Sequence, residues 1–494
     1  MKTLDVDLQS IQEVRDLIAN AKEAQKQLAK MSQEQIDRIV KAMADAAYAN
    51  AEKLARMANE ETGFGKWQDK IVKNTFASKI VYEEIKDMKT VGVIAENKET
   101  KTVDVAVPVG VVAGLIPSTN PTSTVIYKAM IAIKGANTIV FSPHPNAKKC
   151  ILETVRILQE AAKMAGAPDN VINCMTVATV QGTDQLMKHK DTKLILATGG
   201  EAMVRAAYSS GTPAIGVGPG NGPAFIEKSA DIKTAVKRIL DSKTFDNGVI
   251  CASEQSVMVE SCIKEKVMEE LKAQGAYFLT TEEAAKLEKF ILRANGTMNP
   301  QIVGKSVETI AKLADLTVPY GTRVLIAHET RVGRQFAYSR EKLAPILAFY
   351  CVEDWKQACE KCTEILLNEG AGHTCIIHTN NEEVINHFAL NIPVSRLLVN
   401  TPGALGGIGA TTGLSPALTL GCGAVGGSST SDNVSPMNLI NVRRVVKGLR
   451  ELEDVAPQTA TASTCNTTLN TCTTGITEDQ VAKILTEVLA QMKK

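Results

Sequence analysis

The sequence predicts an α/β fold with two doubly wound α/β domains, a β-hairpin flap and a C-terminal tail helix. Between residues 111 and 200, short apolar runs alternate with helix-like segments, as in a parallel sheet covered by helices. A second α/β alternation covers residues 246–425. Two strand-like runs around a charged tip at 90–108 precede the first alternation, and an amphipathic segment ends the chain.

Length and composition indicate an ordinary globular protein. A chain of 494 residues can hold roughly two to four domains with large cores. The formal net charge of +1 gives no field that favours nucleic acid or an anionic membrane. No apolar run has the length of a membrane span, and the N-terminus lacks the apolar core of a signal peptide. Eleven cysteines, an odd number, indicate reduced thiols in a cytoplasmic protein.

The elements of the first half follow from local patterns. Residues 10–60 show helical spacing of apolar side chains among Ala, Lys, Glu and Gln. Residues 90–94 and 102–107 predict the two strands of the hairpin. The continuous apolar run 111–116 predicts a strand that is covered on both faces. Further strands are expected at 138–141, 171–175 and 194–197, with helices at about 147–165 and 183–188.

The loops that follow these strands predict a ligand crevice. Ligands of doubly wound sheets bind outside the carboxyl ends of the strands, so loops 117–121, 142–146 and 198–200 should face one crevice. The Gly-rich run 216–222 does not fit G-x-G-x-x-G, so the ordinary Rossmann fingerprint is absent. This run is either a flexible loop or a place where the backbone approaches a ligand closely.

The second α/β region carries a possible metal motif. Cys359 and Cys362 form a C-x-x-C pair in a helix-like segment, but zinc requires four ligands and a second pair is lacking. We therefore expect a structural pair and no metal site. The expected elements of this region are helices near 263–274, 282–294 and 353–369, strands 324–327 and 375–378, and a cleft-lining loop at 403–430.

The tail after Val455 has its own character. Residues 456–475 are rich in Thr and uncharged, which predicts a disordered linker. Residues 476–494 predict an amphipathic helix that begins with a capping box between Thr477 and Gln480. Its apolar stripe must be buried, either against its own domain or against a partner. We favour a docking peptide, because a short helix is marginal alone.

Cys251 is the most informative residue of the chain. It follows a Gly-containing turn and the apolar pair Val249-Ile250, and small and polar residues come after it. A thiol held at such a turn beside a cleft suits chemistry through a thioester. On the local pattern alone, a buried free cysteine without a catalytic role is the alternative.

Together these pieces resemble the CoA-acylating aldehyde dehydrogenases, especially the acetaldehyde/propionaldehyde type of bacterial microcompartments. The resemblance covers about residues 10–450, and its most specific part is the run 245–256, FDNGVICASEQS. It implies an aldehyde dehydrogenase-like fold that oxidises a short aliphatic aldehyde with NAD and transfers the acyl group to CoA. The chain also looks like the aldehyde half of fused aldehyde/alcohol dehydrogenases, and it is too short to carry their iron-dependent half.

The resemblance implies three catalytic residues. Cys251 would form a hemithioacetal and then a thioacyl enzyme. Asn120 would donate its side-chain amide to the oxyanion beside the backbone N–H of Cys251, although a plain Asn-Pro turn is the alternative. His373 would lie near the cysteine and help CoA to attack or leave, because imidazole moves protons near neutral pH. A structural histidine is the alternative there, and Cys422 is preferred as a packing residue over a second nucleophile.

The resemblance also implies a set of cofactor-binding residues. The turn at 198–200 opens a helix whose N-terminus favours pyrophosphate. The loop at 142–144 corresponds to the contact with the adenosine ribose, and Glu341 would hold the nicotinamide ribose as part of an E-x-x-x-P-x-L run. The full set is Ser142, Pro143, His144, Thr198, Gly199, Gly200, Gly218, Glu341 and Pro345.

One departure favours acyl transfer over hydrolysis. Hydrolytic aldehyde dehydrogenases carry a water-activating glutamate in an E-L-G-G-K run, whereas the corresponding stretch here, 216–220, has no carboxylate. Without that base the thioacyl enzyme is spared for a thiol acceptor. Two alternatives stay open: a hydrolytic aldehyde dehydrogenase that releases a free acid, and a non-catalytic microcompartment-associated protein.

The resemblance divides the chain by function. It implies an NAD/CoA-binding domain (1–89 and 109–245), a catalytic domain (246–430) and an oligomerisation flap (90–108 and 431–450). Because exposed strand edges invite pairing, a homodimer or a dimer of dimers is implied. The tail helix 476–494 resembles an encapsulation peptide that binds shell proteins or co-encapsulated enzymes, which places the protein in the lumen of a microcompartment. Aldehyde chain length and the choice of NAD over NADP are not fixed by the sequence.

Overall fold

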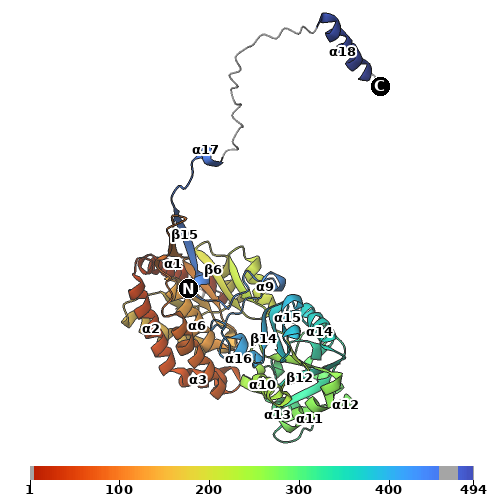
Figure 1. Ribbon diagram of the computed structural model, residues 1–494. Coiled ribbons are helices and arrows are strands. Elements are labelled where there is room, and N and C mark those ends of the chain that lie inside the picture. Colours follow the sequence, from red (N-terminus) through yellow and green to blue (C-terminus); the bar gives the residue numbers. More distant parts are fainter. Residues whose placement is uncertain (1–4, 456–476, 493–494) are drawn as a thin grey trace. The chain divides into compact units, whose positions relative to one another are not determined.

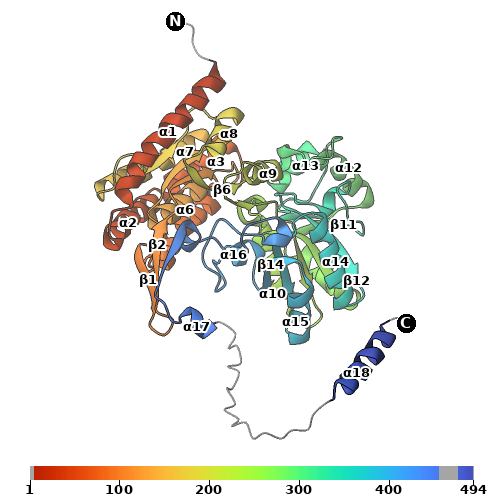
Figure 2. The same cartoon turned by 90° about the horizontal axis from the view of Figure 1, so that it is seen from above.

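The computed structural model describes residues 5–455 and 477–492. Residues up to Val446 form one compact unit, and the residues from Lys447 onward form a second, which is described by itself. The compact unit holds a five-stranded, a seven-stranded and a three-stranded sheet. In Figures 1 and 2, the red to yellow elements and the green to cyan elements from α10 to α15 gather in separate lobes. The predicted α/β class is confirmed.

The N-terminal region is helical, as the spacing of its apolar residues predicts. Each long helix buries one stripe, which in α2 includes Ile36, Ile39 and Met43. Ser32 and Gln35 form a capping box that begins α2. The helices are α1 (Val6–Leu28), α2 (Gln33–Ala49), α3 (Ala51–Thr62), α4 (Trp67–Thr75) and α5 (Val81–Ile85), with a π-helical turn at Phe76–Ile80 before α5.

The first parallel sheet has the strand order β5-β4-β3-β6-β7. The chain runs from β3 through β4 to β5 and then returns to place β6 on the other side of β3. The topological switch point therefore lies between the carboxyl ends of β3 and β6, where such sheets bind ligands. Its strands are β3 (Val111–Leu115), β4 (Thr138–Ser142), β5 (Ile172–Cys174), β6 (Thr192–Thr198) and β7 (Ala214–Val217). Its helices are α6 (Pro121–Lys134), α7 (Lys148–Met164), α8 (Val180–Lys188) and α9 (Glu201–Ser209).

The second parallel sheet has the order β10-β11-β12-β9-β8-β13-β14. Strand β8 lies inside this sheet although it precedes residue 246, where the sequence places the domain boundary. Its short Gly-Pro start next to a Gly-rich run gives no clear strand pattern. The strands are β8 (Gly222–Ile226), β9 (Glu254–Glu260), β10 (Ala276–Phe278), β11 (Val324–His328), β12 (Ile346–Val352), β13 (Gly372–His378) and β14 (Val394–Val399). The helices are α10 (Ile232–Thr244), α11 (Lys264–Ala273), α12 (Thr281–Ile291), α13 (Val307–Leu313), α14 (Trp355–Asn368), α15 (Glu382–Asn391) and α16 (Gly403–Gly407).

The third sheet contains the predicted hairpin. Strands β1 (Gly92–Asn97) and β2 (Thr102–Pro108) pair antiparallel, and β15 (Ile440–Val446) pairs antiparallel with β2. Arg444 donates from Nε to Asp104 across the β15–β2 pair at 3.2 Å. Apolar side chains of this sheet are exposed, among them Val93, Val442 and Val446. The hairpin and the segment 441–446 therefore form one sheet with an uncovered apolar surface.

The second unit contains two short helices, α17 (Leu452–Val455) and α18 (Glu478–Gln491). The described part of this unit has no buried residue in either helix. The predicted capping box is wrong: in the described tail the Thr477 side chain caps no N–H, because its backbone oxygen already accepts the Gln480 N–H at 2.8 Å. The predicted linker 456–475 lies outside the described residues. Across residues 5–455 and 477–492, no helix combines the length and the apolar character that a membrane span requires.

Candidate active site

Cys251 lies between a left-handed turn and the amino end of β9. Asp246 and Asn247 have φ values of 49° and 53°, and Gly248 has a φ of 78°. The left-handed region favours Asn, Asp and Gly over other residues. A Cβ at Gly248 would lie 3.1 Å from two carbonyl oxygens. The predicted Gly-containing turn therefore exists, and Cys251, which follows it, is partly exposed.

Four loops meet at this edge of the second sheet. Strands β8, β9, β12 and β13 run parallel, so their amino ends share one edge. Gly220, Cys251, Glu341 and His373 lie in the segments that lead into, or open, these strands. The sheet thus gathers residues that are up to 153 positions apart in the sequence (220 to 373).

Gly220 brings the Gly-rich run against the cysteine. A Cβ on Gly220 would lie 2.0 Å from the carbonyl oxygen of Cys251 and 3.2 Å from Cε1 of His373. A larger residue could not occupy this position without moving one of them. The close backbone approach that the sequence leaves open is therefore made to the main chain of Cys251, and it brings the loop 216–220 beside both Cys251 and His373.

His373 is a buried, neutral imidazole. Its Nδ1 shares a 2.9 Å hydrogen bond with the Thr374 hydroxyl, and its Nε2 has no hydrogen-bond partner among the described residues. Burial, and then the positive charge of Arg396, lower the pKa of His373 to about 3. The imidazole is therefore uncharged at neutral pH, and one of its ring nitrogens carries a free lone pair.

The Cys251 thiol is protonated at neutral pH. Burial, and after it the nearby Glu341 and Cys422, raise the pKa of Cys251 to about 12, while Arg396 acts in the opposite direction. Because the thiolate is the nucleophile, the site needs a group that takes this proton. Glu341, with a pKa of about 8, is itself mostly protonated at neutral pH, which leaves the unpaired Nε2 of neutral His373 as the nearby acceptor.

Glu341 is tied to the loop that contacts the cysteine. Its Oε1 accepts a 2.9 Å hydrogen bond from the Gly220 N–H, and its own N–H donates to Glu369 at 2.9 Å. Burial and the nearby charge of Glu369 raise the pKa of Glu341 to about 8. Glu341 is therefore a part of the site and not a solvated surface charge.

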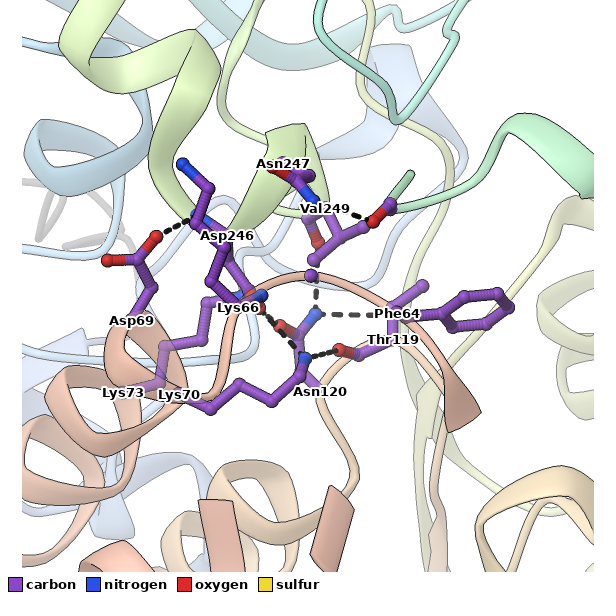
Figure 3. A network of polar contacts seen from close by, with 12 residues as sticks. Phe64, Lys66, Asp69, Lys70, Lys73, Thr119, Asn120, Asp246, Asn247 and Val249 are labelled. Carbon is purple, nitrogen blue, oxygen red and sulfur yellow. Dashed lines mark hydrogen bonds and ion pairs between the residues drawn. The ribbon is translucent and has the colours of Figure 1, made fainter. Parts of the chain in front are cut away.

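Asn120 presents its amide to the cysteine loop (Figure 3). Its Nδ2 donates to the carbonyl oxygen of Val249, two residues before Cys251, and to the Thr119 hydroxyl, both at 3.2 Å. Its Oδ1 accepts from Lys73 at 2.6 Å. The amide N–H groups thus face the loop that carries Cys251, as an oxyanion donor requires.

The turn at 198–200 has free donors at the switch point. Thr198 ends β6, and Gly200 is the N-cap residue of α9. Gly200 has no side chain to cap the first N–H groups of the helix, so these remain available to an anion. The Thr198 hydroxyl is buried and has no partner within the described part of the chain. An unpaired buried hydroxyl beside a helix N-terminus fits a bound phosphate-containing cofactor.

The loop at 142–144 is less open. Ser142 is buried and shares a 2.8 Å hydrogen bond with the Thr183 hydroxyl, so its side chain is already used inside the protein. Pro143 is buried as well. His144 is half-buried, and its Nδ1 accepts the Asn146 N–H at 3.1 Å. Of the three predicted residues, His144 is the most accessible.

A cavity of about 440 Å³ lies beside α9. Gly218 lines it together with Glu201, Arg205, Asn368 and Cys422. The Asn368 amide nitrogen is buried and has no partner among the described residues, so a polar ligand in this cavity would satisfy it. Pro345 lies elsewhere, on a second cavity of about 330 Å³.

The predicted C-x-x-C pair is part of a core. Cys359 and Cys362 are buried, and the Cys362 thiol contacts the Met258 sulfur at 3.8 Å. Within the described ranges no group of three or more His, Cys, Asp or Glu side chains is arranged to hold a metal ion.

Several site residues escape the sequence analysis. Arg396 is buried, donates to the Gly421 carbonyl oxygen at 2.7 Å, and is close enough to Cys251 and Cys422 to affect their pKa values. It stands alone in an apolar strand, which gives no local signal. Lys73 and Asp246 also escape, although Asp246 lies in the most specific run of the sequence.

Comparison with known proteins identifies the family. The model of the aldehyde dehydrogenase family matches residues 2–413. The chain belongs to this family. A bifunctional aldehyde-alcohol dehydrogenase of Escherichia coli is 44% identical over 443 residues, which cover 89% of this chain and 50% of that protein. The chain therefore spans about half the length of this curated relative. An acetylating succinate-semialdehyde dehydrogenase of Clostridium kluyveri is 41% identical over 87% of this chain and 95% of its own length.

Solved structures of aldehyde dehydrogenases share the fold. A probable aldehyde dehydrogenase from Listeria monocytogenes has a TM-score of 0.91 and 70% identity and covers 92% of this chain and 100% of its own. A propionaldehyde dehydrogenase from a Clostridium phytofermentans microcompartment has a TM-score of 0.80 and 31% identity, covering 88% and 97%. A Rhodopseudomonas palustris propionaldehyde dehydrogenase, with bound CoA and an acylated cysteine, has a TM-score of 0.80 and 26% identity, covering 88% and 97%. The predicted aldehyde dehydrogenase-like fold is confirmed.

Proposed function

We propose that this chain oxidises a short aliphatic aldehyde, such as acetaldehyde or propionaldehyde, with NAD and transfers the acyl group to CoA. One observation carries the proposal. Cys251 is partly exposed, its main chain and neutral His373 both lie against Gly220, and the loop 216–220 that contains Gly220 carries no carboxylate. Relatives whose names include acetylating activity, and a related structure with CoA and an acylated cysteine, support it.

The residues of this chain supply the nucleophile, the oxyanion donors and a proton acceptor. Cys251 Sγ forms a bond to the aldehyde carbon, the thiol proton passes to His373, and the carbonyl electron pair moves to oxygen. The Asn120 amide and the Cys251 N–H donate to that oxygen, each such donor being worth ~3 kcal/mol. Bound NAD would supply the hydride acceptor, and loss of the hydride from this carbon would leave a thioester on Cys251. After His373 has released the first proton to solvent, the CoA thiol attacks this carbon, its proton passes to His373, and the Cys251 thiolate leaves.

The cofactor sites are inferred from the loops and the cavity described above. We infer that the turn at 198–200 and the helix α9 bind the pyrophosphate, and that the cavity lined by Gly218 and Asn368 receives nucleotide or CoA groups. Glu341 lies beside Cys251, where a nicotinamide ribose must be held for hydride transfer. His144 is the accessible candidate at the ribose end, whereas Ser142 and Pro143 are buried beside it and Pro345 lies on the other cavity. No step requires a metal ion.

Hydrolysis is the competing activity. A hydrolytic enzyme needs a base that activates water against the thioester. The loop 216–220 provides none, although Glu341 is near. The decisive experiment measures NADH formation from acetaldehyde with and without CoA, together with acyl-CoA by mass spectrometry. We expect multiple turnovers only with CoA, and rapid multiple turnover without CoA would establish hydrolysis instead.

A non-catalytic role is the alternative from another class. It predicts that removing the thiol has no effect on any reaction. Cys251→Ala should abolish aldehyde-dependent NADH formation, whereas Cys422→Ala, a matched buried cysteine of the same site, should leave most of it. Activity that survives in Cys251→Ala would refute the catalytic assignment.

We further propose that the three-stranded sheet mediates a homodimer or a dimer of dimers. Its exposed Val93, Val442, Val445 and Val446 give an apolar surface that a second copy can cover. In this proposal, residues 1–89 and 109–245 bind NAD and CoA, residues 246–430 carry the catalytic cysteine, and residues 90–108 with 431–450 form the oligomerisation flap.

The tail helix is proposed as an encapsulation peptide. All of its apolar stripe is exposed: Val481, Ile484, Leu485, Val488, Leu489 and Met492. Such a stripe suits docking on a shell protein or a co-encapsulated enzyme, and one relative comes from a microcompartment. The protein would then work in the lumen of a microcompartment in the bacterial cytoplasm.

A further inference from the structure

A buried charge cluster connects α4 to the cysteine loop. Lys70 and Lys73 of α4 are each 3% exposed, and the Asp246 side chain between them is 0% exposed. Asp246 accepts from both ammonium groups through Oδ2, at 2.9 Å from Lys70, and from the Lys66 N–H through Oδ1 at 2.7 Å. Buried ion pairs contribute little net stability compared with apolar residues of the same size. The cluster therefore calls for a reason other than stability.

The two lysines differ in what else they touch (Figure 3). Lys70 donates to the Thr119 carbonyl oxygen at 3.2 Å. Lys73 donates to Oδ1 of Asn120 at 2.6 Å. The two lysines lie on one helix, are equally buried and bind the same carboxylate oxygen, but their other contacts differ. Only Lys73 of the two contacts the side chain proposed to bind the oxyanion.

The Asn120 side chain does not cap the helix that it precedes. It is the N-cap residue of α6, where an Asn oxygen usually accepts an N–H of the first turn. Within the described structure its side chain caps no N–H of α6. The oxygen binds Lys73 instead, and the NH₂ group turns toward Val249 and the cysteine loop.

Lysine is suited to select this orientation. Only the NH₂ end of an amide can donate to an oxyanion, and a flipped amide would present an oxygen and repel it. An ammonium group has donors only, so it is satisfied by Oδ1 and not by the NH₂ group. We propose that Lys73, held by Asp246, is a positioning residue that fixes the Asn120 amide with its donors toward the oxyanion. This rests on the proposed function, in which Asn120 binds that oxyanion.

Asp246 also connects the cysteine loop to α4. It lies five residues before Cys251 (246 to 251), in the left-handed turn, and its own N–H donates to Asp69 of α4 at 2.8 Å. Gly65 leaves room for it, because a Cβ there would lie 1.7 Å from its Oδ1. One carboxylate thus sets the distance between α4, the Asn120 amide and the loop that carries the nucleophile.

The test uses a reaction that forms the oxyanion without NAD or CoA. Attack of Cys251 on 4-nitrophenyl acetate gives a tetrahedral oxyanion and releases 4-nitrophenol in a burst. Alkylation of Cys251 by iodoacetamide, followed by peptide mass spectrometry, forms no oxyanion. We expect Lys73→Met to slow the burst by ~10²–10³, the usual effect of losing one oxyanion donor, and to leave the alkylation rate unchanged. Lys70→Met, the matched control, should slow the burst far less.

A double-mutant cycle shows whether Lys73 acts through Asn120. Asn120→Ala should slow the burst as Lys73→Met does, and the double variant should be no slower than Asn120→Ala alone. Lys73→Gln keeps a donor for Oδ1 and should restore part of the rate, and Asp246→Asn provides an independent route to the same loss. Additive losses, or equal losses in Lys70→Met and Lys73→Met, would overturn the proposal.

The proposed function fails separately. If the unmodified protein gives the ester burst but no CoA-dependent NADH, the acylating activity is refuted while the cycle still tests Lys73. If it gives no burst at all, Cys251 is no acyl-accepting nucleophile, and both proposals are overturned.

Discussion

The backbone N–H of Gly220 donates a 2.9 Å hydrogen bond to Glu341, while the α-carbon of Gly220 faces the carbonyl oxygen of Cys251. One residue without a side chain thus connects the Glu341 carboxylate and the main chain of Cys251. In hydrolytic members the corresponding stretch supplies a carboxylate, whereas here it supplies backbone. The chemistry of the site therefore depends on the shape of this loop as well as on its charges.

Gly220→Ala should disrupt the site. The added Cβ would lie 2.0 Å from the Cys251 oxygen, so one of the two loops must move, and such overpacking costs roughly 1–3 kcal/mol. We expect a lower Tm and a large loss of kcat. Gly218→Ala in the same loop meets no atom within 4 Å and should keep the Tm of the unmodified protein. Equal Tm values for the two variants would contradict the close approach.

The reactivity of Cys251 should depend on pH in an unusual way. Because the pKa of Cys251 is about 12 in the free enzyme, its alkylation by iodoacetamide should keep rising from pH 7 to 10 without a plateau. Peptide mass spectrometry separates this thiol from the exposed Cys262 and Cys351. A plateau near pH 8.5 would show that the thiol is not desolvated as the structure indicates.

Glu341→Gln should raise that reactivity only in alkaline solution. With a pKa of about 8, Glu341 is neutral below pH 8 and resembles Gln, whereas above pH 8 its negative charge disfavours the thiolate. The variant should react about three to ten times faster above pH 8 and equally fast below it. A uniform effect across the pH range would indicate a structural change instead of a charge effect.

Two buried histidines should make the fold sensitive to acid. Burial lowers the pKa of both His373 and His378 to about 3, and both ring nitrogens of His378 lack partners among the described residues. The unfolded chain binds their protons near pH 6.5, so the free energy of unfolding falls as pH drops below 6.5 and continues to fall toward 3. Each contributes a loss of about 2 kcal/mol between pH 6.5 and 5.

His378→Phe should remove one of these losses. Urea unfolding at pH 7 and pH 5 should show a smaller difference in the free energy of unfolding for this variant than for the unmodified protein. His387→Gln, which changes a half-buried histidine packed edge-on against Trp355, should retain the full difference. An unchanged difference in His378→Phe would show that His378 is not held neutral by burial.

The sequence predicts the elements with regular patterns and misses those that depend on tertiary contacts. The strand Val111–Leu115 is continuously apolar because both of its faces are covered, and that pattern is visible in one dimension. Strand Gly222–Ile226 has no such pattern, and its place between β9 and β13 of the second sheet becomes visible only in three dimensions. The role of Lys73 could not be predicted, because its contact with Asn120 joins residues 47 positions apart.

The position of Cys251 can be predicted from the sequence for a different reason. Cys251 follows a turn with a left-handed backbone at Asn247 and Gly248, residue types that favour this conformation. The local sequence therefore indicates the turn. Arg396 has no such mark, since its guanidinium donates to carbonyl oxygens of a loop that lies beside it only in the folded chain. A residue whose local backbone conformation requires a certain residue type can thus be predicted from the sequence. A residue whose partners are distant in the sequence cannot.

Removing residues 456–494 should separate catalysis from docking. The compact unit ends at Val446, and the described residues of α17 and α18 bury no side chain, so kcat, KM and Tm should not change. Co-purification with shell proteins from co-expressing cells should be lost.

Within the full chain, Leu485→Asp should weaken the association at least about tenfold, because burial of one Leu is worth roughly 1.5–3 kcal/mol. Lys483→Ala, on the polar face of the same helix, should retain it. Equal shell association of the truncated and full-length chains would show that the compact unit, and not the apolar stripe of α18, carries the docking surface.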